Sequence, residues 1–323
     1  MPVRRCRDRR CRRLRPRCRQ ARRTLLHLGP GLANGLANLH NARRAATPIV
    51  NIVGDHATYH LQYDALLTSD IVGFARPVSS WVHESKSARL VASDVARALQ
   101  AACSAPGGIA TLILPADAAW NPAERAAERL PDIGPAVVSA DRIEDVARLI
   151  SNGKKTAMLL RGRALIGKGL EAAGRIQART GARLLCDTFA PHAEMGAGRV
   201  PVERIPYFGE RVAAFLAGTE QMIMVGSTPP VSFFAYPDKP SWCVPEACQL
   251  VYLAQPHEDG VAAVQGLADA LGAPQEISIR VSLQLPGLPS GLLNSLSVAQ
   301  IITQLTPDHA IYADESNTSS LPL

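Results

Sequence analysis

Short apolar runs alternate with amphipathic stretches from residue 24 onward. Buried strands are predicted at residues 24–28, 48–53 and 109–115, because each is a short apolar run bounded by glycine, proline or polar residues. Residues 76–82 contain Pro77 and are expected to form an edge strand or an extended loop. A helix with one buried face is predicted from apolar residues at steps of three and four, namely Ala88, Val91, Ala92, Val95, Leu99 and Ala102.

A second series of strands and helices follows residues 121–140, which are rich in Ala, Pro, Glu and Arg and are interpreted as a linker. This series covers residues 141–275. Its predicted helices and strands are a helix at 141–151, strands at 156–160, 182–186, 221–225 and 249–253, and helices at 168–180 and 261–271.

The chain continues with a proline-rich linker at residues 276–292, a predicted helix at 295–305 and a predicted strand at 310–313. One helix and one strand bury too little apolar area to be stable alone. Residues 293–323 are therefore interpreted as the start of a third domain that is cut short. The predicted fold class is α/β, with two parallel-sheet, three-layer domains and the first elements of a third.

Positive charge is concentrated in the first 23 residues. Twelve arginines and one aspartate give this segment a net charge of +11, so the remaining residues carry −4 of the total +7. The segment has almost no apolar residues, and we expect it to be disordered. Its composition is typical of GC-rich DNA translated in a shifted frame, and we interpret it as non-native; an arginine-rich arm or a transit peptide is the alternative. We do not expect nucleic-acid binding from the rest of the chain.

The chain has no uninterrupted apolar run of the roughly 18 residues that a membrane helix needs, and no apolar core of a secretion signal. We therefore expect a cytoplasmic protein. The spacing of its seven cysteines and eight histidines matches neither a zinc site nor a disulfide framework. No metal site is predicted.

The segment His27 to Gly35 reads HLGPGLANG, and together with residues 38–48 it resembles the pyrimidine-binding domain of enzymes that depend on thiamine diphosphate (ThDP). Residues 112–117, LILPAD, resemble the closing strand of that domain. The second unit resembles the middle domain of the acetolactate synthase and benzoylformate decarboxylase family, and residues 310–319 resemble the start of its diphosphate-binding domain. The resemblance runs in family order from residue 24 to the end, so residues 24–120 are identified with a partial pyrimidine-binding domain.

The resemblance implies ThDP-dependent carboligation or decarboxylation of a 2-oxo acid by a homo-oligomer, with Mg²⁺ holding the cofactor. Family members activate ThDP with a glutamate about 25 residues before the Gly-Pro-Gly turn. Here that place falls near Arg4 and Arg5, and no glutamate precedes Glu84. The family's Gly-Asp-Gly motif is also missing after Glu315. We therefore expect this chain to be inactive alone.

The resemblance assigns a catalytic role in proton transfer to His27 and contact with the pyrimidine side of ThDP to Gly29, Pro30, Gly31 and Asn34. Glycine permits a close approach of backbone to cofactor. The structural alternatives are a strand-end histidine that hydrogen-bonds nearby backbone and an ordinary strand-to-helix turn.

The sequence departs from the family pattern at two positions, so the resemblance does not identify the substrate. The second histidine of the benzoylformate decarboxylase branch falls near Phe233 and Phe234, which cannot transfer protons, and the glutamine of acetolactate synthases is replaced by Asp55 and His56.

A non-catalytic nucleotide-binding or regulatory α/β module is the alternative function. Gly162, Gly167 and Gly169 resemble a dinucleotide loop, but their spacing departs from the dinucleotide fingerprint, and no acidic residue marks a ribose site. FAD is therefore not expected. Asp187 follows a strand, where it would contact a ligand or cap the next segment.

Overall fold

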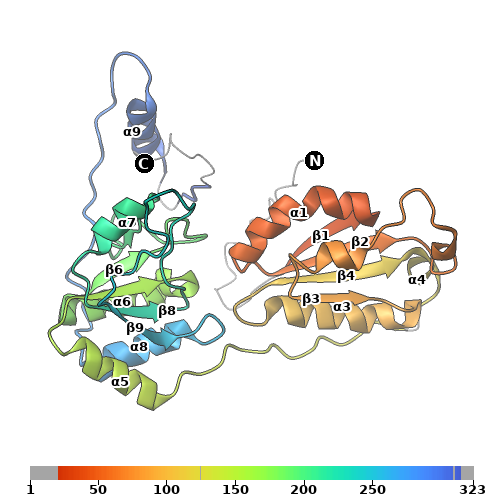
Figure 1. Cartoon of the computed structure of the whole chain (residues 1–323), viewed down its shortest axis with the longest axis horizontal. Coiled ribbons are helices and arrows are strands. Elements are labelled where there is room, and N and C mark those ends of the chain that lie inside the picture. Colours follow the sequence, from red (N-terminus) through yellow and green to blue (C-terminus); the bar gives the residue numbers. More distant parts are fainter. Residues whose placement is uncertain (1–20, 124, 308–309, 314–323) are drawn as a thin grey trace.

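The computed structural model describes residues 21–123, 125–307 and 310–313, which form two separate α/β units (Figure 1). Each unit contains one parallel sheet with helices on both faces, so the predicted α/β class is confirmed. The expected disorder of the basic tail concerns residues 1–20, which lie outside the described residues. The first strand begins at Arg22, so Arg22 and Arg23 belong to the sheet and not to the tail.

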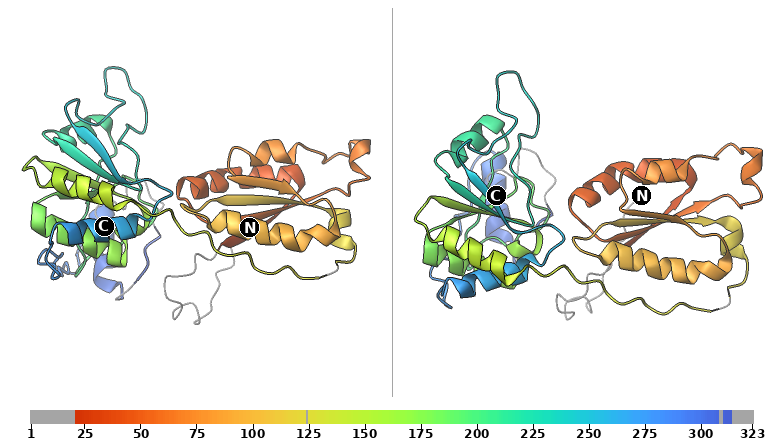
Figure 2. Two further views of the ribbon diagram at one scale, coloured as in Figure 1. Left: turned by 90° about the horizontal axis from the view of Figure 1, so that it is seen from below. Right: turned by 60° about the horizontal axis from the view of Figure 1, so that its bottom comes forward.

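The first unit is a four-stranded parallel sheet in the order β1-β2-β4-β3. Its helices α1 and α3 cover opposite faces (Figure 2). The elements are β1 (Arg22–His27), α1 (Leu28–Arg44), β2 (Ile49–Asp55), the 3₁₀ turn Leu61–Tyr63, α2 (Ile71–Ala75), β3 (Trp81–Glu84), α3 (Ala88–Cys103), β4 (Ile109–Pro115) and α4 (Ala116–Trp120).

Alternate residues of β2 supply two different cores. Ile49 and Val53 pack with Leu32 and Leu39 of α1, whereas Val50 packs with Ala98 and other small residues of α3. Successive side chains of a strand point to opposite faces, and both faces of this strand are covered. This explains why apolar residues of the strand face both sides of the sheet, with Asn51 as the one buried polar side chain among them.

The buried face of α3 differs from the prediction. Leu99 is 39% exposed, while Asp94 is buried and accepts a hydrogen bond of 2.9 Å from the Ser85 hydroxyl. The carboxylate of Asp94 also lies 3.1 Å from Nε2 of His83. The helix is turned so that Asp94 meets the polar side chains at the end of β3, because a buried carboxylate needs such partners. An edge strand is present as β3 at the margin of the sheet, but it begins at Trp81, so only the last two residues of the predicted range 76–82 belong to it.

The second unit is a five-stranded parallel sheet in the order β7-β6-β5-β8-β9. Met158 and Leu160 of β5 point to the core under α6 and α8, and Ala157 and Leu159 point to the core under α7. The elements are α5 (Ala140–Ile150), β5 (Thr156–Leu160), the 3₁₀ turn Gly162–Leu165, α6 (Gly167–Thr180), β6 (Arg183–Cys186), β7 (Glu203–Arg204), α7 (Gly209–Leu216), β8 (Gln221–Val225), β9 (Gln249–Ala254) and α8 (Gly260–Ala270).

Past the second unit the chain forms α9 (Ser295–Leu305), which begins with a capping box at Asn294 and Ser297. The strand predicted at 310–313 is wrong. These four residues have no strand conformation and pair with no strand in the described part of the chain, and Ile311 is almost fully exposed. An extended segment needs a neighbouring strand for its backbone hydrogen bonds. Within the described residues, no helix is long and apolar enough to cross a membrane.

The segment between the two units is attached to both of them. The side-chain amide of Gln100, near the end of α3, donates a hydrogen bond of 2.9 Å to the carbonyl of Pro131. Ala136 donates to the carbonyl of His257, in the loop after β9. Pro131 and Ala136 are joined by so few residues that they can lie at most about 18 Å apart. The amino end of β4, which follows α3, is therefore near the second unit, and its carboxyl end points away (Figure 1).

A ladder of buried polar side chains crosses the first sheet. Asn51 of β2 accepts from the hydroxyl of Thr24 (2.7 Å) and donates to that of Thr111 on β4 (3.1 Å), which also bonds Ser79 (2.7 Å). Thr24, Asn51 and Thr111 are in register across three strands. A slip by one residue would bury these groups without partners, so the ladder fixes the register.

We predict that Asn51→Ala lowers the free energy of unfolding by about 2–3 kcal/mol, because it leaves buried hydroxyl groups with fewer partners. The measurement is the urea unfolding transition followed by circular dichroism. Asn38→Ala, on the exposed side of α1, is the matched control and is expected to shift stability by less than about 0.5 kcal/mol. Equal transitions for the two variants would show that the ladder does not fix the register.

Candidate functional site

The carboxyl ends of the four parallel strands meet at one edge of the first sheet, which we call the carboxyl edge. His27 ends β1 beside Gly54, Asp55 ends β2 beside Pro115, and Glu84 ends β3. Ligands of open parallel sheets bind outside this edge. The titratable side chains of the first unit that sequence analysis singled out lie along it.

His27 is the residue from which α1 starts, and no separate turn intervenes. Its backbone is extended, and Leu28, the first residue of α1, has a positive φ of 57°, so the change of direction from strand to helix is made at Leu28 itself. Its imidazole is exposed and makes no side-chain hydrogen bond within the described residues. The alternative of a strand-end histidine bonded to nearby backbone therefore finds no support.

The predicted Gly-Pro-Gly turn is the first turn of α1. Pro30 fits there because the first backbone nitrogens of a helix have no carbonyl partner in the helix. Gly29 is buried, and a Cβ atom on it would overlap the side chain of Ser69. Gly31 has more room, since a Cβ there would lie 3.6 Å from that of His27. Asn34 lies on the exposed surface of α1.

Asp55 and His56 occupy the end of β2. The backbone N–H of His56 donates to the Asp55 carboxylate at 2.7 Å. Burial raises the pKa of Asp55, and the negative charge of Glu84 adds to this, while the contacts with His56 oppose it. Nε2 of His56 is buried and has no hydrogen-bond partner among the described residues. Its ring lies 5.5 Å from that of His60.

Asp117 fixes the loop after β2. Its carboxylate accepts hydrogen bonds from the backbone N–H (3.0 Å) and the hydroxyl (2.6 Å) of Thr58. These bonds lower the pKa of Asp117 because they favour the ionised form. Sequence analysis did not assign this role, because the two residues are 59 positions apart.

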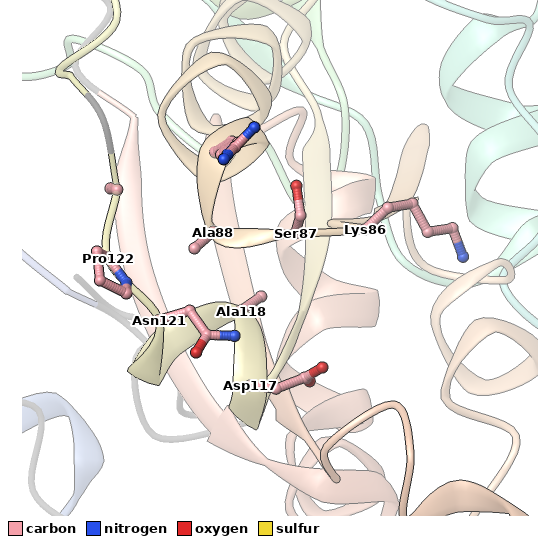
Figure 3. Close-up of a pocket in the computed structure, with 9 residues that line it drawn as sticks. Lys86, Ser87, Ala88, Asp117, Ala118, Asn121 and Pro122 are labelled. Carbon is pink, nitrogen blue, oxygen red and sulfur yellow. The ribbon is translucent and has the colours of Figure 1, made fainter.

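A polar hollow of about 430 Å³ lies beside Asp117, at the start of α3 (Figure 3). Ser87 and Ala88 lie across it from Ala118 and Asn121. Its remaining lining residues are Lys86, Arg89, Pro122 and Ala123. Lys86 pairs with Glu84 at 3.1 Å, so the positive charge here is partly balanced.

Glu84 is the first glutamate of the chain. It lies on β3, too far across the sheet to contact a molecule that is bound next to the start of α1. Two strands, β2 and β4, separate β3 from β1. At about 4.8 Å per strand, Glu84 is roughly 14 Å from β1 across the sheet. No described group of three or more His, Cys, Asp or Glu side chains could hold a metal ion.

The glycines of the second unit are required by the conformation and close packing of its backbone. Gly162 and Gly167 have positive φ angles (61° and 49°), and a Cβ at Gly169 would lie 2.7 Å from the carbonyl oxygen of Arg163. The N–H of Gly167 at the start of α6 donates to the carboxylate of Glu194 at 3.1 Å. A carboxylate thus already occupies the position where a dinucleotide-binding helix receives phosphate.

Asp187 pairs with an arginine of the neighbouring strand end and caps no described helix. Its carboxylate forms a two-pronged ion pair with Arg161, with distances of 2.6 and 3.0 Å. The pair links the ends of β5 and β6.

Comparison with known proteins found similar sequences among acetolactate synthases. The chain is 47% identical over 300 residues to the Mycobacterium tuberculosis protein named acetolactate synthase large subunit IlvX, covering 93% of this chain and 57% of that protein. It is 30% identical over 139 residues to acetolactate synthase large subunit IlvG of the same organism, covering 42% of this chain and 25% of IlvG. The chain thus spans little more than half of the relative IlvX. No family model matches the chain.

Solved structures with the same fold are enzymes that depend on ThDP. The chain superposes on the 4-hydroxybenzoylformate decarboxylase of Rhodococcus jostii RHA1 with a TM-score of 0.75 at 17% identity, covering 93% of this chain and 60% of that one. A ThDP-dependent enzyme of Mycobacterium smegmatis gives a TM-score of 0.71 at 20% identity, covering 89% and 59%. These likenesses establish the fold, and with the sequence match they confirm the family resemblance.

We predict that Gly29 and Gly31, in the first turn of α1, differ in their tolerance of alanine. Gly29→Ala should lower the free energy of unfolding by about 1–3 kcal/mol, because the new methyl group overlaps Ser69. Gly31→Ala should be neutral or slightly stabilising, since alanine favours a helix. Urea unfolding of both variants measures the difference. Equal destabilisation would mean that the turn is constrained at both positions.

We also predict opposite pH effects at the two aspartates. The raised pKa of Asp55 means that its ionised form opposes folding, so Asp55→Asn should raise the unfolding midpoint at pH 7 and change it little near pH 3. The lowered pKa of Asp117 means that its ionised form favours folding above the unfolded pKa, so Asp117→Asn should lower the midpoint at pH 7. Thermal unfolding across this pH range tests both signs, and shifts in the same direction would contradict the assignment.

Proposed function

Because this chain is similar in sequence to acetolactate synthase large subunits and in fold to ThDP-dependent enzymes, we propose that it contributes to ThDP-dependent carboligation or decarboxylation of a 2-oxo acid. The 47% identity with IlvX carries this proposal. We assign the pyrimidine side of the site to the carboxyl edge of the first unit, with His27 as the group that transfers protons. The exposed surface of α1 with Asn34 would form one wall.

The described residues do not fit ThDP by themselves. ThDP brings the capacity to stabilise a carbanion next to a former carbonyl group, and the protein must supply a carboxylate to the aminopyrimidine. Glu84 lies roughly 14 Å across the sheet from the start of α1. The 323 residues also contain no Gly-Asp-Gly triplet to hold Mg²⁺ and the diphosphate. We therefore propose that residues 1–323 do not catalyse the reaction alone.

A homo-oligomer fits the direction of the carboxyl edge. The attachments of Pro131 and Ala136 keep the amino end of β4 near the second unit, so His27 faces away from it. Groups that cover this edge must then come from another part of the chain or from a second chain. We propose a cytoplasmic setting for this assembly, as expected from the sequence.

A non-catalytic nucleotide-binding module is the second candidate, and one observation weighs against it. The carboxylate of Glu194 accepts the N–H of Gly167 at the start of α6, and Arg199 lies 3.4 Å from the same carboxylate. An adenine dinucleotide would have to displace this carboxylate to place its phosphates there. We therefore do not assign FAD to the second unit.

We predict that the purified chain with ThDP, Mg²⁺ and pyruvate releases no carbon dioxide and forms no acetolactate, because the carboxylate and the diphosphate ligands are missing. Isothermal titration should give a dissociation constant for ThDP above about 1 mM, and no stoichiometric binding of FAD or ATP. Turnover would refute the proposed incompleteness. Tight binding of FAD or ATP would favour the nucleotide-binding module instead.

A further inference from the structure

The first strand of the first unit has a free edge. β1 lies at one margin of the sheet and pairs with β2, and with no other strand in the described part of the chain (Figure 1). It contains no proline, and its register with β2 runs without a shift. Another strand can be added to an edge of this kind. The opposite margin differs, since β3 is four residues long and all of them are partly buried.

The backbone groups of Arg23, Leu25 and His27 point to this free edge. The N–H of Arg22 donates to the carbonyl of Pro48 at 2.8 Å, so residue 22 and every second residue after it turn toward β2. Successive residues of a strand direct their N–H and C=O groups to opposite sides. The three residues in between therefore direct theirs away from β2, where no described strand receives them.

The side chain of Leu25 is exposed at the same place. Leu25 is in register with Ile52, whose side chain packs with the small residues of α3. Leu25 itself is 77% exposed, so α3 does not extend over this part of β1. A strand added to the free edge would place a neighbouring side chain next to Leu25 on the same face of the sheet. Unpaired backbone and an uncovered apolar side chain thus call for the same kind of partner.

The charge at the amino end of β1 favours an antiparallel partner. Residues 1–23 carry a net charge of +11 and reach into the first two residues of this strand. A parallel second copy would bring two such segments side by side. An antiparallel copy separates them by the length of the strand, roughly 20 Å. This exceeds the Debye length of about 8 Å at physiological ionic strength, so the repulsion between the two segments is largely screened.

The direction of the backbone groups also indicates the register of two antiparallel copies. Only residues that point outward can exchange hydrogen bonds, and the register centred on Leu25 pairs all three of them within β1. It places Leu25 opposite Leu25 of the second copy, and Arg23 opposite His27. Two apolar side chains then meet at the centre, and no two arginines lie opposite each other.

We propose that β1 binds β1 of a second copy of this chain, antiparallel about a twofold axis at Leu25. The two four-stranded sheets then form one continuous sheet, and a single closed contact uses both free edges. This contact lies along the side of the sheet and leaves the carboxyl edge open, so it is separate from any assembly that covers that edge. A strand pair of this length is smaller than a standard interface, and we expect a dissociation constant of about 1–100 µM.

Charge substitutions at residue 25 test the twofold axis in the full chain. Leu25→Lys and Leu25→Glu each place like charges opposite each other in a dimer of identical chains, so each should raise the dimer dissociation constant roughly tenfold or more. An equal mixture of the two variants places opposite charges there and should restore the dimer. Sedimentation equilibrium measures all three samples. Leu292→Lys and Leu292→Glu are the matched controls, at a leucine that is 93% exposed, and should leave the constant unchanged.

Disulfide formation supplies the second readout. Opposite Cα atoms of a hydrogen-bonded antiparallel pair are about 5.5 Å apart, which is within the range that a disulfide spans. Mild oxidation of Leu25→Cys should therefore join two copies through the substituted position, as identified by mass spectrometry of unreduced peptides. Leu292→Cys should give no comparable product under the same conditions.

Three results would overturn the proposal. One is a chain that stays monomeric up to about 100 µM. Another is a mixture of the two charge variants that associates no better than either variant alone. The third is an oxidised Leu25→Cys variant whose copies are joined only through other cysteines. None of these results depends on ThDP binding or turnover, so they leave the proposed function untouched.

Discussion

The structure depends on strands that are buried on both faces. In β2 and β5, successive side chains pack into cores on opposite faces of the sheet. Each sheet must therefore be covered by helices on both faces. Parallel strands joined by helices then bring all carboxyl ends to one edge. The positions of His27 and Asp55 follow from this constraint, and so does the place where a ligand would meet the first unit.

Strands and long helices were predictable because their signals are local. The runs at 109–115 and 221–225 are apolar enough to require burial, and both are strands with the predicted limits. The face of α3 was not predictable, because the buried Asp94 depends on His83 and Ser85 at the end of β3 as well as on Arg97 of its own helix. The strand at 310–313 failed for a related reason, since its apolar residues find no neighbouring strand among the described residues.

The position of the candidate site could be predicted from the sequence, but the contacts that its residues make could not. Local spacing placed the glycine turn after β1, yet Gly29 is needed for packing against Ser69, forty residues away in sequence. Glu194 reaches Gly167 across 27 residues and gives the start of α6 a partner that no short motif reveals. Ring contacts in the second unit likewise join three separate segments between Phe189 and Tyr236. Such contacts depend on the completed fold.

The short attachment between the two units limits where the carboxyl edge of the first unit can lie. If the linker were free along residues 121–139, the first unit could rotate and cover its own carboxyl edge. The bonds to Pro131 and Ala136 leave only a few residues between the units and remove that freedom. The described second unit therefore leaves the carboxyl edge uncovered, and His27 is exposed there. Groups that shield this edge from water must come from residues other than those of the described second unit.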